Sequence, residues 1–170
     1  MSNRNAFLVM LKKSEGTEGI GDNGYDCLFG STAAHPKLFP RVPNGSPDYR
    51  DHPRQDFTVP RLGITTSAAG AFQIEAHIFD YYRKTLSLAD FGHTSQIAIA
   101  MEMIKECHAM PDIDAGNLAA AVAACAHLWA SLSGAGYGQR ENSMDTLTQY
   151  FTESGGVLSA NGVTNDASNA

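Results

Sequence analysis

The sequence predicts an α+β protein, a mainly helical bundle with one small lobe of β-structure and loops. Three observations lead to this prediction. Apolar residues recur at helical spacing over residues 3–15 and again after residue 70. The segment between them is rich in Gly, Pro, Asn and Asp and has only short apolar runs. The 170 residues, 43% hydrophobic and 18% charged, suit a single globular domain of ordinary composition.

The first element is a helix over residues 3–15. Its inward positions follow the i, i+3, i+4, i+7 spacing of one helical face. Gly16 supplies the stop, so Glu15 is expected to be the last helical residue. The positions on that face are Phe7, Met10, Leu11 and Ser14.

The β and loop lobe is expected over about residues 17–66. Six of the seven prolines fall in this stretch, which argues against long regular hydrogen-bonded strands. Short apolar runs such as Tyr25–Phe29 predict turns with a small β-ribbon.

Four more helices are predicted after residue 70, because the helical period of apolar residues returns there. Ser, Thr, Asp or Asn precedes three of them as a capping residue. The predicted helices run over about 70–86, from Thr94 or Ser95 to Pro111, from a cap at Asp114 through Trp129, and from Asn142 or Ser143 to Gly155. The domain is expected to span residues 1–156, with residues 157–170 as a flexible polar tail.

Charge and composition exclude several classes of protein. The net charge is −6, and residues 61–170 hold eleven acidic side chains against five basic ones. No basic stripe exists for a nucleic-acid partner. The longest apolar run near the start, Ala6–Leu11, is too short for membrane insertion, so synthesis in the cytoplasm is expected. The three cysteines, without CxxC spacing, predict free thiols in a reducing compartment.

Glu15 is the first candidate for chemistry. A carboxylate at the C-terminal end of a helix faces the negative end of the macrodipole, so we expect its pKa to rise. A raised pKa is what a general acid needs at neutral pH. The alternative is a solvated Glu at the end of a helix beside Lys12 and Lys13.

Five sequence blocks occur in a fixed order along the chain: Ala6–Thr17, Gly24–Asp26, Asp48–Arg54, Gly70–Ile74 and Trp129–Gln139. Together they resemble the phage lambda endolysin family, over roughly residues 4–156. The segment between Glu15 and Tyr25 is shorter than in the family's namesake, and residues 31–47 form a longer stretch. These departures affect loops that border the expected cleft.

The resemblance implies a lysozyme-like fold with an active-site cleft between the helical bundle and the lobe. It also implies a lytic transglycosylase that cleaves the MurNAc-GlcNAc β-1,4 bond of bacterial peptidoglycan and leaves 1,6-anhydro-MurNAc. Glu15 matches the family's catalytic acid. No cofactor and no metal ligand are implied, and the expected partner is the glycan strand, with a holin needed only indirectly, for release of a monomeric enzyme. The expected substrate-binding residues are Gln73, Tyr137, Asp26, Ser14 and Tyr25.

Two alternatives stay open. A hydrolytic muramidase on the same fold needs a second carboxylate, for which Asp22 and Asp26 are the nearby candidates. A saccharide-binding or virion structural module needs no catalytic acid, so the presence of Glu15 argues against it.

Other residue groups are better explained by structure than by chemistry. His35, Asp48, Asp51 and His52 match no metal-ligand spacing. Cys107 and Cys125 each have a histidine close in sequence, but neighbours at i, i+1 or i, i+2 on a helix do not face each other, so buried thiols are expected. Trp129 is expected in the core, and Arg54 is expected to anchor its loop through an Asp–Arg pair.

Overall fold

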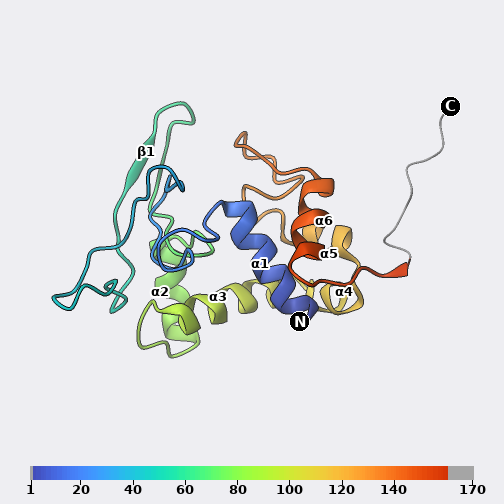
Figure 1. Cartoon of the computed structure of the whole chain (residues 1–170), viewed down its shortest axis with the longest axis horizontal. Helices are drawn as coiled ribbons and strands as arrows, with labels where there is room; N and C mark the ends of the chain where they lie inside the picture. Colours follow the sequence, from blue (N-terminus) through green and yellow to red (C-terminus); the bar gives the residue numbers. More distant parts are fainter. Residues whose placement is uncertain (1, 161–170) are drawn as a thin grey trace. The chain divides into compact units, whose positions relative to one another are not determined.

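The computed structural model describes residues 2–160, and its chain forms six helices and a two-stranded sheet over these residues (Figure 1). No helix in this range is both long and apolar enough to cross a membrane. The chain divides into two compact units. We call residues 11–102 the lobe unit, and residues 2–10 with 103–160 the helical unit. The elements are α1 (Asn3–Glu15), β1 (Phe57–Val59), β2 (Ile64–Thr66), α2 (Ala76–Thr85), α3 (His93–Glu106), α4 (Met110–Ala115), α5 (Leu118–Cys125) and α6 (Met144–Glu153).

The α+β class and the limits of α1 agree with the sequence-based prediction. The lobe unit holds the small β-ribbon, in which β1 and β2 pair antiparallel with Phe57 opposite Thr66. The apolar run Tyr25–Phe29 forms no strand of this ribbon. It makes isolated bridges, in which Cys27 pairs with Leu38 and Leu28 pairs with Ala69. The rest of the predicted loop segment is turns and irregular backbone.

Two helix limits differ from the prediction, for backbone reasons. The helix expected from residue 70 begins at Ala76, because Gln73 has φ +48° and Ala69 bridges to Ile74. A left-handed residue cannot continue a right-handed helix. The next helix was expected to reach Pro111 but ends at Glu106, and His108 (φ +58°) lies in the turn that follows.

The helix predicted from Asp114 through Trp129 is confirmed only over α5, Leu118–Cys125, because Asp114 belongs to the separate helix α4 and the chain leaves the helix after Cys125. Pro111 does not end a helix but lies in the first turn of α4, where its missing N–H costs nothing. Gly116 (φ +78°) ends α4. Asp114 caps no helix; its carboxylate accepts hydrogen bonds of 2.7 and 2.6 Å from the guanidinium of Arg4.

The last helix and the core of the helical unit agree with the prediction. Ser143 precedes α6, and its Oγ accepts a hydrogen bond from the amide of Thr146. Trp129 is buried, as expected. The buried side chains of α1 within this unit, of α5 and of α6 include Phe7, Met10, Leu118, Val122, Cys125, Leu147 and Phe151.

The first residues of the predicted tail form hydrogen bonds within the helical unit. Val157 exchanges two hydrogen bonds with the side chain of Asn3, and the amide of Ser159 donates to the carbonyl of Gly116. Residues 161–170 of the predicted tail lie outside the described residues.

One buried side chain holds three segments of the lobe unit together. Gln96, on α3, has no solvent-exposed surface. Its Oε1 accepts a hydrogen bond of 2.8 Å from the amide of Ala71. Its Nε2 donates to the carbonyls of Tyr25 and Phe91, at 2.9 and 2.8 Å. The amide approaches so closely that a Cβ on Gly70 would lie 2.2 Å from Gln96 Oε1.

Replacement of Gln96 by leucine is expected to lower the free energy of unfolding by about 3 kcal/mol or more. The change leaves one buried N–H and two buried carbonyls without their partner, and each unsatisfied group costs about 1–3 kcal/mol. Chemical denaturation followed by circular dichroism measures the loss. The control Gln149→Leu, at an exposed position of α6, is expected to change stability by less than about 1 kcal/mol. Equal stability of the two variants would contradict the role of Gln96.

Candidate active site

Glu15 is half-buried at the last position of α1, and a fixed turn follows it. Gly16 (φ +75°) leaves the helix in a left-handed conformation. Thr17 is buried, and its Oγ1 donates to the carbonyl of Ala71 at 2.7 Å and lies 3.2 Å from the carbonyl oxygen of Lys12. The end of α1 is therefore tied to the turn formed by residues 70–73.

That turn carries Gln73. Its amide and its Nε2 both donate to the carbonyl of Gly70, at 3.2 and 3.0 Å, which stabilises the left-handed backbone at this residue. Gln73 is two positions after Ala71, the partner of Thr17. The hydrogen bond between Thr17 and Ala71 therefore brings the segment that follows Glu15 next to the segment that carries Gln73.

Tyr25 also belongs to this arrangement, because Gln96 binds both its carbonyl and the amide of Ala71. The Tyr25 ring stacks on His93 with 3.9 Å between ring centroids, and Lys12 Nζ lies 4.9 Å from the ring centroid. Lys12 is buried and forms an ion pair of 2.6 Å with Glu18. Burial, together with the charges of nearby carboxylates, raises the pKa of Tyr25, so its hydroxyl stays protonated at neutral pH.

Asp26 was expected to contact substrate, but its side chain has no exposed surface. One carboxylate oxygen accepts from the amide of Asp22 at 2.7 Å, and the other accepts from Arg41 at 2.9 Å. A Cβ on Gly21 would lie 2.3 Å from this carboxylate. Asp26 therefore holds the turn between Glu15 and Tyr25 in place and presents no oxygen to solvent. Ser14, a further expected contact, is 9% exposed.

Asp22 lies in the same turn and is part of a polar network. Its Oδ2 accepts from the hydroxyl of Tyr49 at 2.9 Å and lies 2.8 Å from His93 Nε2. Partial burial opposes ionisation, but these two hydrogen bonds outweigh it and lower the pKa of Asp22. The carboxylate is thus ionised at neutral pH and engaged with two side chains.

Tyr137 lies in the helical unit, in the glycine-rich segment after Trp129, and its side chain is 53% exposed. Its hydroxyl donates to the carbonyl of His127 at 2.7 Å. The carboxylate of Glu141 accepts from the amides of Gly134 and Gly136, at 2.9 and 2.7 Å. Two backbone donors of the glycine loop are therefore bound within the protein rather than presented to a ligand.

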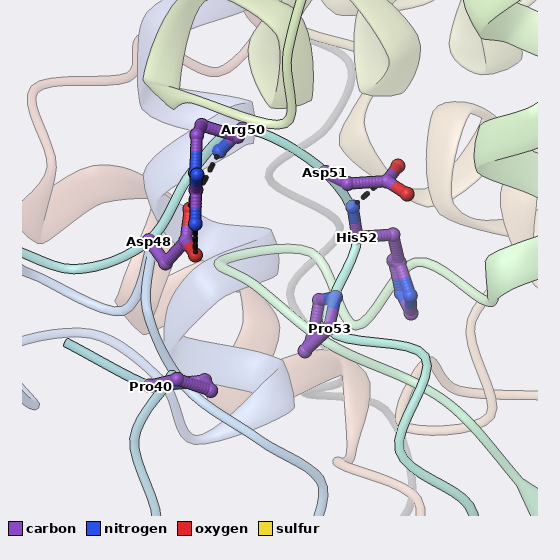
Figure 2. Close-up of a pocket in the computed structure, with 6 residues that line it drawn as sticks. All are labelled: Pro40, Asp48, Arg50, Asp51, His52 and Pro53. Atoms are coloured by element: carbon purple, nitrogen blue, oxygen red, sulfur yellow. Dashed lines mark hydrogen bonds and ion pairs between the residues drawn. The ribbon is translucent and has the colours of Figure 1, made fainter. Parts of the chain in front are cut away.

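A surface pocket of about 320 Å³ lies in the lobe unit along the segment Asp48–Pro53. Figure 2 shows Arg50 beside Asp48, with which it pairs at 2.6 Å, and His52 beside Pro53. His52 is buried; its Nε2 donates to the carbonyl of Ile74, and its Nδ1 accepts from the amide of Arg54. Burial lowers the pKa of His52, so the ring is neutral at pH 7.

Arg54 anchors its loop, as predicted. Its guanidinium pairs with Asp51 at 3.0 Å and with Asp80 of α2 at 2.6 Å. Both carboxylates have lowered pKa values because of hydrogen bonds from Arg54. Within residues 2–160, no group of three His, Cys, Asp or Glu side chains is placed to hold a metal ion.

The sequence-based reasoning missed the residues that hold the site in place. Gln96, Thr17, Arg41 and Glu141 each bind a group more than four residues away in the chain. Helical or strand periodicity does not reveal such pairs. The one sequence signal is the glycine cluster near Glu141, which indicates a tight turn in need of hydrogen-bond acceptors.

A family profile described as Endolysin matches residues 5–158. The chain belongs to the endolysin family. Its members degrade the peptidoglycan of the host and bring about host lysis, and this endolysin is a peptidoglycan-degrading enzyme.

Two curated relatives are similar over most of their length. This endolysin is 42% identical over 160 residues to the endolysin of Escherichia phage lambda, covering 91% of this chain and 92% of that protein. It is 38% identical over 159 residues to the endolysin of Escherichia phage P2, covering 89% and 92%.

Two solved structures share its lysozyme-like fold. One is the bacteriophage lambda lysozyme complexed with a chitohexasaccharide, with a TM-score of 0.81, 41% identity and coverage of 92% of this chain and 96% of that one. The other is lysozyme from bacteriophage lambda, with a TM-score of 0.77, 40% identity and the same coverage.

The neutral His52 makes a pH-dependent contribution to stability. Its pKa is lowered in the folded state, so the unfolded chain binds a proton more readily. Stability is complete above the ordinary pKa of about 6.5 and falls as the pH drops below it. We expect thermal melts to show a smaller loss of stability between about pH 7 and pH 5 in His52→Gln than in the unmodified chain. The control His35→Gln, at an exposed position, is expected to keep the full loss. Parallel pH profiles of all three proteins would contradict this assignment.

Proposed function

We propose that this endolysin is a lytic transglycosylase in which Glu15 is the single acid–base residue. The observation that carries the proposal is the state of the two other candidate carboxylates. Asp26 is fully buried and paired with Arg41. Asp22 is bound by Tyr49 and His93. A hydrolase needs its second carboxylate to act as a nucleophile or to activate water. The burial of Asp26 and the two hydrogen bonds on Asp22 Oδ2 support a reaction that uses neither carboxylate.

In the proposed reaction, Glu15 protonates the glycosidic oxygen between MurNAc and GlcNAc. The substrate's own 2-acetamido group stabilises the developing positive charge at C1, as in substrate-assisted glycosidases. The Glu15 carboxylate then accepts the proton of the C6 hydroxyl of MurNAc. That oxygen attacks C1, and the product is 1,6-anhydro-MurNAc. General acid–base transfer contributes about 10²–10⁴-fold, so positioning and electrostatics supply the rest of the acceleration.

We propose that Gln73 and Tyr25 of the lobe unit, and Tyr137 of the helical unit, each contact the glycan strand, as does Ser14, the neighbour of the acid in sequence. The saccharide complex of the related lambda lysozyme supports a sugar polymer as ligand. Asp26 acts as a positioning residue, because its buried carboxylate fixes the turn that carries Tyr25. We propose a monomeric enzyme without a cofactor that is made in the cytoplasm and reaches the wall after a holin opens the membrane.

Replacement of Glu15 by glutamine is expected to lower the rate of cell-wall solubilisation by at least about 100-fold, because the amide cannot donate the proton. Binding to purified peptidoglycan, measured by sedimentation, is expected to persist. The matched control is Glu153→Gln on α6, an exposed Glu that accepts a hydrogen bond from Gln149. Full lysis by Glu15→Gln would rule out Glu15 as the acid.

The product distinguishes a transglycosylase from a muramidase. We expect mass spectrometry of muropeptides released from purified peptidoglycan to show anhydro ends, lighter by one water than hydrolysed ends and resistant to borohydride reduction. The same digest made with a hydrolytic muramidase serves as the reference for reducible ends. Reducible MurNAc ends from this endolysin would establish the hydrolytic alternative and direct attention to Asp22.

A further inference from the structure

Two of the three cysteines meet in the helical unit although eighteen positions separate them in the chain. Cys107 directly follows α3, and Cys125 is the last residue of α5. Each thiol contributes to the pKa shift of the other, so the two side chains lie near each other. The third cysteine, Cys27, is buried in the lobe unit.

A histidine completes the cluster. His127 Nε2 lies 3.8 Å from the Sγ of Cys107. Cys107 is half-buried, while Cys125 is fully buried. The cluster therefore has one thiol that a reagent in solution can reach, a base beside that thiol, and a second thiol behind it.

Both thiols are protonated at neutral pH in the reduced protein. Burial is the largest cause of the raised pKa of each thiol. The pKa of Cys107 is raised, and that of Cys125 is raised to about 12. Neither group is an activated nucleophile of the kind that a thiol hydrolase uses. Two adjacent protonated thiols beside a base suit slow oxidation to a stable disulfide instead.

We propose that Cys107 and Cys125 form an intramolecular disulfide when this endolysin meets a disulfide-bonded oxidant outside the reducing cytoplasm. The wall on which endolysins act lies in such an oxidising compartment. A disulfide needs its sulfur atoms about 2.05 Å apart. Cys107 lies 3.8 Å from His127, two residues after Cys125, and each thiol affects the pKa of the other, so the two sulfur atoms start this approach from nearby positions.

The reaction balances as two thiol–disulfide exchanges. His127 accepts the proton of Cys107, and the thiolate attacks one sulfur of the oxidant RSSR. A mixed disulfide forms, and RS⁻ leaves and takes up a proton as RSH. Cys125 then loses its proton and attacks the sulfur of Cys107. The Cys107–Cys125 bond forms, a second RSH leaves, and the oxidant has taken up the two electrons that the thiols lose.

The Cys107–Cys125 disulfide would also restrain the backbone that binds Tyr137. His127 is two residues from Cys125, and its carbonyl accepts the hydroxyl of Tyr137. A covalent link between the ends of α3 and α5 restrains the backbone from which that hydrogen bond is made. Oxidation is therefore expected to slow amide hydrogen exchange in residues 126–128.

The test uses the full-length protein incubated with oxidised glutathione and then denatured. We expect a loss of two hydrogen atoms in the intact mass, one titratable thiol instead of three, and a linked peptide that joins Cys107 to Cys125. Cys27→Ser is expected to keep the loss of two hydrogen atoms. Cys107→Ser and Cys125→Ser are each expected to abolish it. Three free thiols after incubation, glutathione retained on Cys107, or a bond that includes Cys27 would each overturn the proposal.

The role of His127 is tested by rate. His127→Asn is expected to slow disulfide formation several-fold at neutral pH and to leave the final extent unchanged, because the base affects the barrier and not the product. The matched control is His108→Asn, an exposed neighbour of Cys107 whose left-handed backbone asparagine tolerates. Equal rates in both variants would remove His127 from the proposal. The assay needs no peptidoglycan, so its failure is distinct from a failure of the proposed transglycosylase activity.

Discussion

The hydrogen bonds of the Gln96 side chain are the constraint on which the lobe unit depends. One amide group satisfies the N–H of Ala71 and the carbonyls of Tyr25 and Phe91, so three segments distant in sequence share one buried polar centre. A buried amide is favourable only when its donors and acceptors are paired, and partial pairing costs more than an apolar side chain would. Any arrangement that breaks one of these hydrogen bonds leaves a buried polar group unsatisfied, so the observed arrangement is favoured. The lack of a side chain at Gly70 lets the backbone approach the Gln96 amide.

The fold was predictable where local signals act alone. The i, i+3, i+4, i+7 stripe and Gly16 place the limits of α1, and the capping side chain of Ser143 places the start of α6. The prediction was wrong where a local signal had two meanings. Pro111 can follow a helix or stand in its first turn, and Asp114 can cap a helix or pair with Arg4 far away in the chain. Local composition is the same for both roles of each residue, and the tertiary contacts of the folded chain determine which role it takes.

The candidate site was predictable as a set of residues but not as an arrangement. The resemblance to a known family directed attention to Glu15, Gln73 and Tyr25, and the structure connects their segments through Thr17 and Gln96. Asp26 was expected to face substrate, yet Arg41 and the amide of Asp22 enclose it. The same limit applies to the thiols. Neighbouring residues in sequence gave no reason to pair Cys107 with His127, because the contact spans two different elements.

The position of the acidic side chains has a consequence for the chemistry. Several carboxylates in the lobe unit are bound by other groups of the protein. Asp26 accepts from a backbone amide, Asp51 and Asp80 accept from the guanidinium of Arg54, and Glu75 accepts from the amide and hydroxyl of Ser67. Hydrogen bonds from Arg54 lower the pKa values of Asp51 and Asp80, which makes these carboxylates weak bases and poor nucleophiles. When the acidic side chains are engaged in this way, the proposed reaction has an advantage, because the substrate supplies both the group that stabilises C1 and the attacking oxygen. The structural use of these side chains and a reaction with one acid thus support each other.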